Sequence, residues 1–70
     1  MTEEEAREIA YHYIRIHLAD KARPIRFTAA PANGYGEPLW EIELAERQKG
    51  QPMGDLLIGR TTGATYEHRK

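Results

Sequence analysis

The stretch Trp40-Glu41-Ile42-Glu43-Leu44 alternates apolar and acidic residues without a break. Alternation with a period of two is typical of a β-strand with one buried face and one solvent-facing face. Trp40, Ile42 and Leu44 are therefore expected in a hydrophobic core, and Glu41 and Glu43 on the solvent side. Because the stretch also holds the only tryptophan, we expect it to form the middle strand of a small antiparallel sheet.

A helix is predicted before this strand, over about residues 3–20. Thr2 and Glu5 have the spacing of a capping box, in which each side chain bonds to the backbone of the other residue. Arg23-Pro24 is expected to end the helix, because the residue before a proline is disfavoured in helical conformation. The helix face expected to lie on the sheet consists of Ala6, Ile9, Ala10, Tyr13, Ile16 and His17.

The same helix carries a second apolar stripe of Tyr11, Ile14 and Leu18. A single-layer sheet cannot cover so wide an apolar arc. Either the sheet curls around the helix, or the stripe meets another polypeptide. Tyr11, Ile14 and Leu18 are therefore candidate partner-binding residues, and a homodimer is one form that this contact could take.

Strands are predicted at about residues 25–30, 38–46 and 54–61, with a short one at 64–67. In the first, Ile25, Phe27 and Ala29 share one face, and prolines on both sides suit a protected edge strand, which leaves the last strand as the open edge.

Three consecutive apolar residues in the third strand, 56–58, indicate that both sheet faces are covered or that a bulge shifts the alternation. Residues 68–70 are expected to form a frayed tail. Tyr35 lies in the glycine-rich loop 30–38. It either folds back over the rim of the core or is an exposed contact residue, and it joins the candidate partner-binding residues.

These elements predict an α+β fold in which one N-terminal helix packs on a three- to four-stranded antiparallel sheet. The order α-β-β-β is half-cystatin-like. Seventy residues form a single domain, 1–70, with a thin core.

Composition argues against several activities. The chain has no cysteine and no serine, which excludes thiol and serine nucleophiles, and His12 and His17 do not share a helix face as a metal pair would. We therefore predict a non-enzymatic protein without catalytic, cofactor-binding or metal-binding residues. A small enzyme that uses His17, oriented by Asp20, is one alternative.

The charge balance of 10 basic and 11 acidic residues argues against nucleic acid as a partner. A module that reads single strands on its sheet face is the second alternative, although Glu41 and Glu43 on that face would repel phosphates. Arg26 is the expected cross-strand partner of one of these glutamates. An acidic N-terminus and the lack of a long apolar run predict no secretory signal in these residues, no membrane contact and a cytoplasmic location.

The closing stretch Ile58-Gly59-Arg60-Thr61-Thr62-Gly63 resembles the end of PepSY-like domains. In that family an apolar residue is followed by an Asp, two variable residues and Thr-Gly. Ile58 and Thr62-Gly63 match the pattern, and Gly59 stands where the family usually has Asp. The same closing motif resembles small bacterial immunity-type proteins.

This resemblance implies a non-catalytic module that binds or inhibits a protein partner. The Thr-Gly pair also has a direct physical interpretation, namely a turn that needs a positive φ at Gly63.

Overall fold

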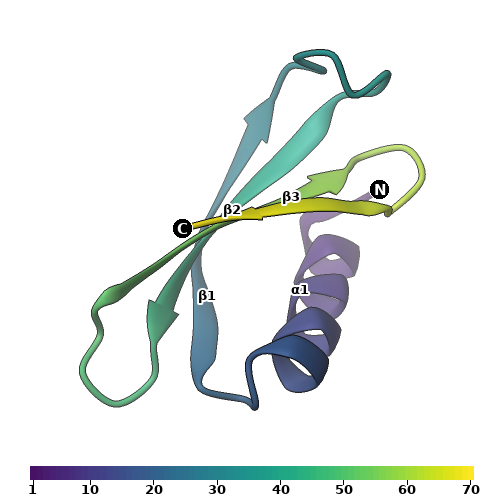
Figure 1. Ribbon diagram of the computed structural model, residues 1–70. Coiled ribbons are helices and arrows are strands. Elements are labelled where there is room, and N and C mark those ends of the chain that lie inside the picture. Colours follow the sequence, from purple (N-terminus) through teal and green to yellow (C-terminus); the bar gives the residue numbers. More distant parts are fainter.

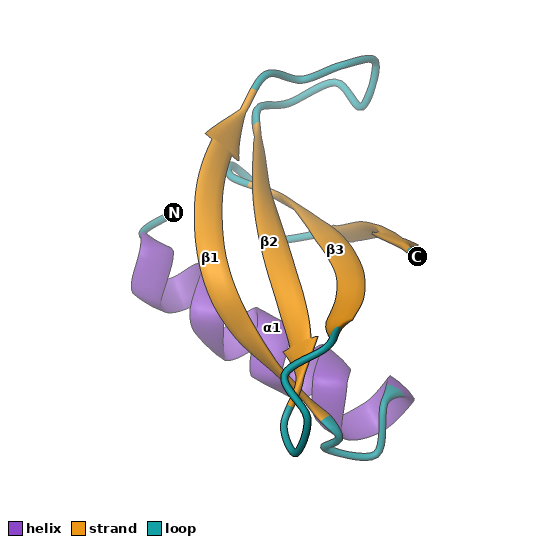
Figure 2. Cartoon of the chain, turned by 90° about the vertical axis from the view of Figure 1, so that its left-hand side faces the viewer, coloured by secondary structure: helices purple, strands orange, loops and turns teal.

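The computed structural model describes all residues from 1 to 70 and has an α+β fold. Helix α1 spans Glu3–His17, and the strands are β1 (Ala22–Ala30), β2 (Leu39–Glu46), β3 (Pro52–Gly59) and β4 (Thr65–Arg69). The strands form one antiparallel sheet in the order β1-β2-β3-β4. The helix crosses one face of this twisted sheet (Figures 1 and 2). The predicted fold class is confirmed, with a fourth strand fully formed.

The predicted capping box forms at the start of α1. Thr2 Oγ1 accepts a hydrogen bond from the Glu5 backbone N–H at 3.2 Å, and Glu5 Oε1 accepts one from the Thr2 N–H at 2.8 Å. The bond from the Thr2 N–H lowers the pKa of Glu5.

The helix ends three residues earlier than the predicted Asp20. Ala19 and Asp20 have φ angles of 51° and 60°, in the left-handed region. The N–H groups of Leu18 and Asp20 both donate to the Ile14 carbonyl, which closes the last turn. The left-handed pair, rather than Pro24, terminates the helix, and β1 therefore begins at Ala22.

The helix rests on the sheet along part of the predicted face. Ala6 and Ala10 are completely buried, and Ile9 and Tyr13 pack against the core, as predicted. Ile14, which was not predicted on this face, is also completely buried, and Leu18 packs against the same core. The completely buried residues and Leu18 follow an i, i+4 ridge whose two alanines let the helix approach the strands closely. Ile16, predicted to face the sheet, is 58% exposed, and His17 is also exposed.

The strand that contains Trp40 supplies the centre of the core as predicted. Ile42 and Leu44 are completely buried and Trp40 is half-buried. Leu56 and Ile58 of β3 complete the core beneath the helix. Burying an aliphatic side chain of this size stabilises the fold by about 1.5–3 kcal/mol.

Both faces of β3 are covered, which explains its consecutive apolar residues. Leu57 lies opposite Glu41, on the face away from the helix, and is nevertheless buried. Leu39 is buried too and lies outside the core under α1. The predicted bulge is also present, because the pairing of β3 with β4 shifts between Leu57 and Ile58, with Tyr66 as the extra residue on β4. Further bulges lie between β1 and β2 and between β2 and β3. One lies between Pro24 and Arg26, and it leaves Ile25 49% exposed instead of on the face of Phe27.

Gly54 in β3 has a φ of 87°, and a Cβ at this position would collide with the backbone carbonyl of Arg69. The close approach of β3 to the end of β4 therefore depends on glycine. Gly50, with a φ of 71°, has open space around its Cβ position, so it is a matched control for the φ angle alone.

We expect Gly54→Ala to lower the free energy of unfolding by about 3 kcal/mol or more, because backbone strain and a backbone collision add. Gly50→Ala should cost only about 1–2 kcal/mol. Urea denaturation followed by Trp40 fluorescence measures both. If both variants lose the same free energy of unfolding, the close approach of Gly54 in β3 to the Arg69 carbonyl in β4 is contradicted.

Candidate functional site

The predicted apolar stripe does not form one surface. Ile14 is completely buried and is not available to a partner, Leu18 packs against the core and is partly buried, and Tyr11 is 37% exposed. The expectation that Tyr11, Ile14 and Leu18 share a docking face was wrong. The two apolar stripes are adjacent, and the alanine ridge selects Ile14 for the sheet.

Tyr35 folds back onto β4. Its ring centroid lies 5.0 Å from that of Tyr66, and its hydroxyl donates to Glu67 Oε1 at 3.3 Å. Glu67 in turn forms an ion pair of 2.7 Å with Arg69, and the hydrogen bond from Arg69 raises the pKa of that guanidinium. The β1–β2 loop is therefore tied to the last strand.

Glu37, in the same loop, holds the β3–β4 turn. Its Oε1 accepts from the backbone N–H groups of Thr61 and Thr62, each at 2.9 Å. Its Oε2 accepts from the Thr62 hydroxyl at 2.6 Å and from the Tyr66 hydroxyl. The side chain is only 8% exposed, so its charge is stabilised by these four donors.

These hydrogen bonds shift two pKa values in opposite directions. The bond from the Thr62 hydroxyl, followed by those from Tyr66 and the turn amides, lowers the pKa of Glu37 to about 2. Donation to Glu37 raises the pKa of Tyr66. Both groups therefore keep their ordinary charge at neutral pH, as a structural contact requires.

Gly59 leaves the space that this carboxylate occupies. A Cβ at Gly59 would collide with the carboxyl group of Glu37. Gly63 has the positive φ, 79°, that the Thr-Gly turn predicted. The turn thus receives its carboxylate from a residue far away in the sequence, where the resembling pattern has an Asp within the turn.

A groove lies between α1 and the first residue of β4. Its volume is about 290 Å³, and it is lined by Ile9, His12, Tyr13, Ile16, His17 and Thr65. Ile16 is the most exposed large apolar side chain of the chain. The free edge of β4 pairs with no other strand, so a groove of mixed apolar and polar lining lies beside the start of an unpaired edge.

The prediction of a frayed tail at 68–70 was wrong for His68 and Arg69, which lie in β4. His68 Nε2 lies 2.8 Å from the Met53 carbonyl oxygen, a contact that helps to hold the end of the strand. The His68 and Tyr13 rings are nearly perpendicular, at 78°, with centroids 5.7 Å apart.

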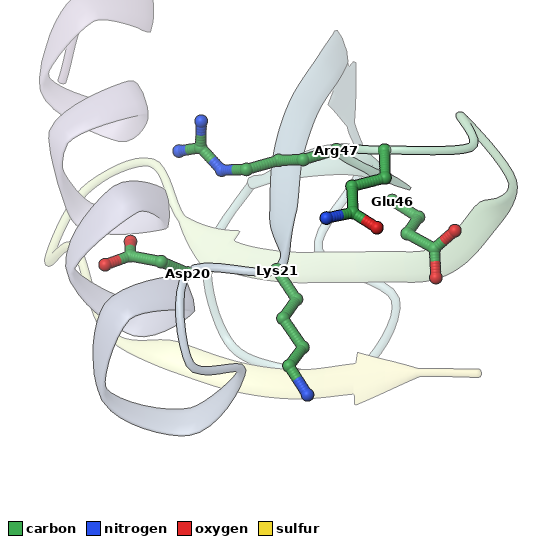
Figure 3. Close-up of a pocket in the computed structure, with 5 residues that line it drawn as sticks. Asp20, Lys21, Glu46 and Arg47 are labelled. Atoms are coloured by element: carbon green, nitrogen blue, oxygen red, sulfur yellow. The ribbon is translucent and has the colours of Figure 1, made fainter.

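His17 stacks against Tyr13, with ring centroids 4.6 Å apart, and forms no hydrogen bond with Asp20. A second hollow, of about 350 Å³, lies between the end of α1 and the β2–β3 turn. Figure 3 shows that its charged side chains diverge, with the Lys21 ammonium and the Glu46 carboxylate pointing away from the Arg47 guanidinium. Neither place gathers groups for a reaction.

On the sheet face away from the helix, Arg26 Nε lies 3.7 Å from Glu43 Oε2, which confirms the expected cross-strand pair. No three His, Asp or Glu side chains come together as metal ligands would. The single helix is too short and too polar to cross a membrane.

The lowered pKa of Glu37 predicts a pH-dependent contribution to stability. Because the folded-state pKa of about 2 lies below the ordinary value of 4.5, this contribution is complete above about pH 5 and disappears as the pH falls toward 2. Glu37→Gln should therefore lower the unfolding temperature by several degrees near pH 6, and the difference from wild type should shrink toward pH 2.

Thermal unfolding followed by circular dichroism between about pH 2 and pH 6 measures this difference. Glu8→Gln, at an exposed helix position, serves as the control and should behave like wild type. If the difference in unfolding temperature between wild type and Glu37→Gln does not change with pH, the lowered pKa of Glu37 is contradicted.

Comparison with known proteins adds no family to these observations. No family model, no curated protein and no solved structure matches the chain. The geometry of β4 and its groove is therefore what supports a functional proposal.

Proposed function

We propose that this chain is a small non-enzymatic module that binds or inhibits a protein partner, and that the partner docks along β4. The observation that carries the proposal is the juxtaposition of an unpaired strand edge with the partly apolar groove that α1 forms beside Thr65. An extended segment added to a sheet edge gains main-chain hydrogen bonds, and a flanking pocket selects its side chains. The exposed Ile16 supplies such a pocket wall.

The other edge of the sheet is less suited to this contact. Pro24 in β1 has no N–H to donate, and the bulge that follows it interrupts the regular edge. β4 contains no proline and lies beside the groove. We therefore assign the contact to β4 rather than β1.

The resemblance to PepSY-like domains supports a binding role of this kind. In the family pattern, an Asp at the position of Gly59 supplies the carboxylate next to the turn. In this chain, Glu37 supplies a carboxylate to the turn instead, and its carboxyl group lies beside Gly59. We propose a cytoplasmic location, because a chain without cysteine fits a reducing compartment, in which disulfides are rare.

If the turn needs a carboxylate, an Asp at position 59 should be able to replace the one that Glu37 supplies. Gly59→Asp alone should destabilise the fold, because its Cβ collides with Glu37 and two carboxylates then share one site. In the double variant Glu37→Ala/Gly59→Asp, the new carboxylate should bond to the amide two residues on. Its unfolding temperature should exceed that of either single variant.

Thermal unfolding of the four proteins measures this coupling, and Glu37→Ala/Gly59→Ala is the control without a carboxylate. If the Asp and Ala double variants unfold at the same temperature, the turn does not require a carboxylate and the likeness to the family pattern loses its physical basis.

The binding proposal is tested with peptides selected from a random library on the immobilised protein. Titration of a selected peptide, followed by amide chemical shifts in NMR spectra, should perturb the amides of Thr65–Arg69 most strongly. Ile16→Asp should raise the dissociation constant by about tenfold or more, because it places a charge in the groove. Ile25→Asp, at a similarly exposed position on β1, should leave it unchanged.

Shifts centred on β1, or equal effects of Ile16→Asp and Ile25→Asp, would contradict docking at β4. A library that yields no binder to wild type in spite of a folded protein would contradict the binding function itself.

A further inference from the structure

The charges of β4 alternate along its free edge. Glu67 lies opposite Leu57 and Arg69 lies opposite Asp55, so both side chains point to the sheet face away from the helix. His68 lies opposite Leu56, on the helix side. On one face, the edge therefore presents an acidic group and a basic group two residues apart.

This pattern limits how the edge could pair with a second copy of itself. A two-fold axis perpendicular to a sheet leaves every side chain on its own face, and directly opposed residues of an antiparallel pair share a face. The axis must then pass beside one particular residue, and each choice of that residue gives one register.

The charges select among these registers. An axis beside Glu67 opposes the two copies of Glu67, and an axis beside Arg69 opposes the two copies of Arg69. An axis beside Tyr66 falls at the bulge, where the alternation breaks. An axis beside His68 opposes Glu67 to the partner's Arg69 and Arg69 to the partner's Glu67.

We propose that β4 pairs antiparallel with the β4 strand of a second copy, with His68 at the two-fold axis. The two four-stranded sheets then form one continuous sheet. This inference rests on the proposed role of β4 as the contact edge and names its occupant as this chain itself. Within each copy, Glu67 and Arg69 form an ion pair of 2.7 Å. In this register each Glu67 also lies opposite the partner's Arg69, so the four side chains form a square of alternating charge on the face away from the helices.

The surfaces beside the strand are suited to the same contact. Both helices lie on one face of the joined sheet. A hollow of about 320 Å³, lined by His68 and Lys70 together with Leu18 and Met53, lies beside the axis on that face. A short strand of five residues forms a small interface, and a weak dimer with a dissociation constant of roughly 10–100 µM is expected.

Analytical ultracentrifugation over a range of concentrations tests this pairing. Wild type should self-associate. Glu67→Arg and Arg69→Glu should each weaken the dimer by about tenfold or more, since every cross-strand pair then has like charges. Mixing the two variants in equal amounts should restore a dimer, because the two copies then carry opposite charges at every pair.

The double variant Glu67→Arg/Arg69→Glu should also dimerise, since the exchange restores opposite charges across the axis. Arg26→Glu, at an exposed position on β1, is the control and should leave the dimer unchanged. Circular dichroism of each protein checks that the fold is retained.

Two results would overturn the self-pairing. One is a wild-type protein that stays monomeric at millimolar concentration, and the other is a mixture of the single variants that stays as weakly associated as each alone. If peptides still bind along β4 in the first case, the proposed binding function stands and only its occupant is wrong. If neither peptides nor a second copy engage β4, the proposed function fails as well.

Discussion

The position of β4 depends on one buried carboxylate. Glu37 is 8% exposed and carries a negative charge that only hydrogen-bond donors can stabilise away from water. Two turn amides and two hydroxyls, all from the segment 61–66, supply those donors. The β1–β2 loop and the β3–β4 hairpin therefore cannot separate without exposing or orphaning this charge.

Several other features also fix the position of β4. Gly59 has no side chain where the carboxyl group lies, and Gly54 allows the other end of β4 to approach β3. Tyr35 adds a ring contact and a hydrogen bond to the same strand. A five-residue strand at the edge of a small sheet would be prone to fraying, and these contacts at both of its ends hold it in place.

The two sheet edges differ in a way that bears on function. β1 is interrupted by a proline and a bulge, features that discourage pairing. β4 has neither proline nor a break near His68, and its charges are arranged so that they oppose most registers and favour one. The helix lies so that Ile16 remains exposed beside β4. The edge available for contact and Ile16, the most exposed large apolar side chain, therefore lie on one side of the molecule.

The amino-acid sequence by itself determined the fold class and the order of the helix and strands, although not the end of α1 or of β4. The alternation around Trp40, the capping box at Thr2 and the positive φ at Gly63 all follow from local patterns, because periodicity and capping involve residues that are near one another in the chain. The tertiary structure alone decided that Ile14 rather than Ile16 packs on the sheet, since two adjacent stripes were equally apolar and only the close approach of Ala6 and Ala10 separates them. It also decided the role of Glu37, because nothing local to that residue shows that the amides of a turn more than twenty residues away will converge on it.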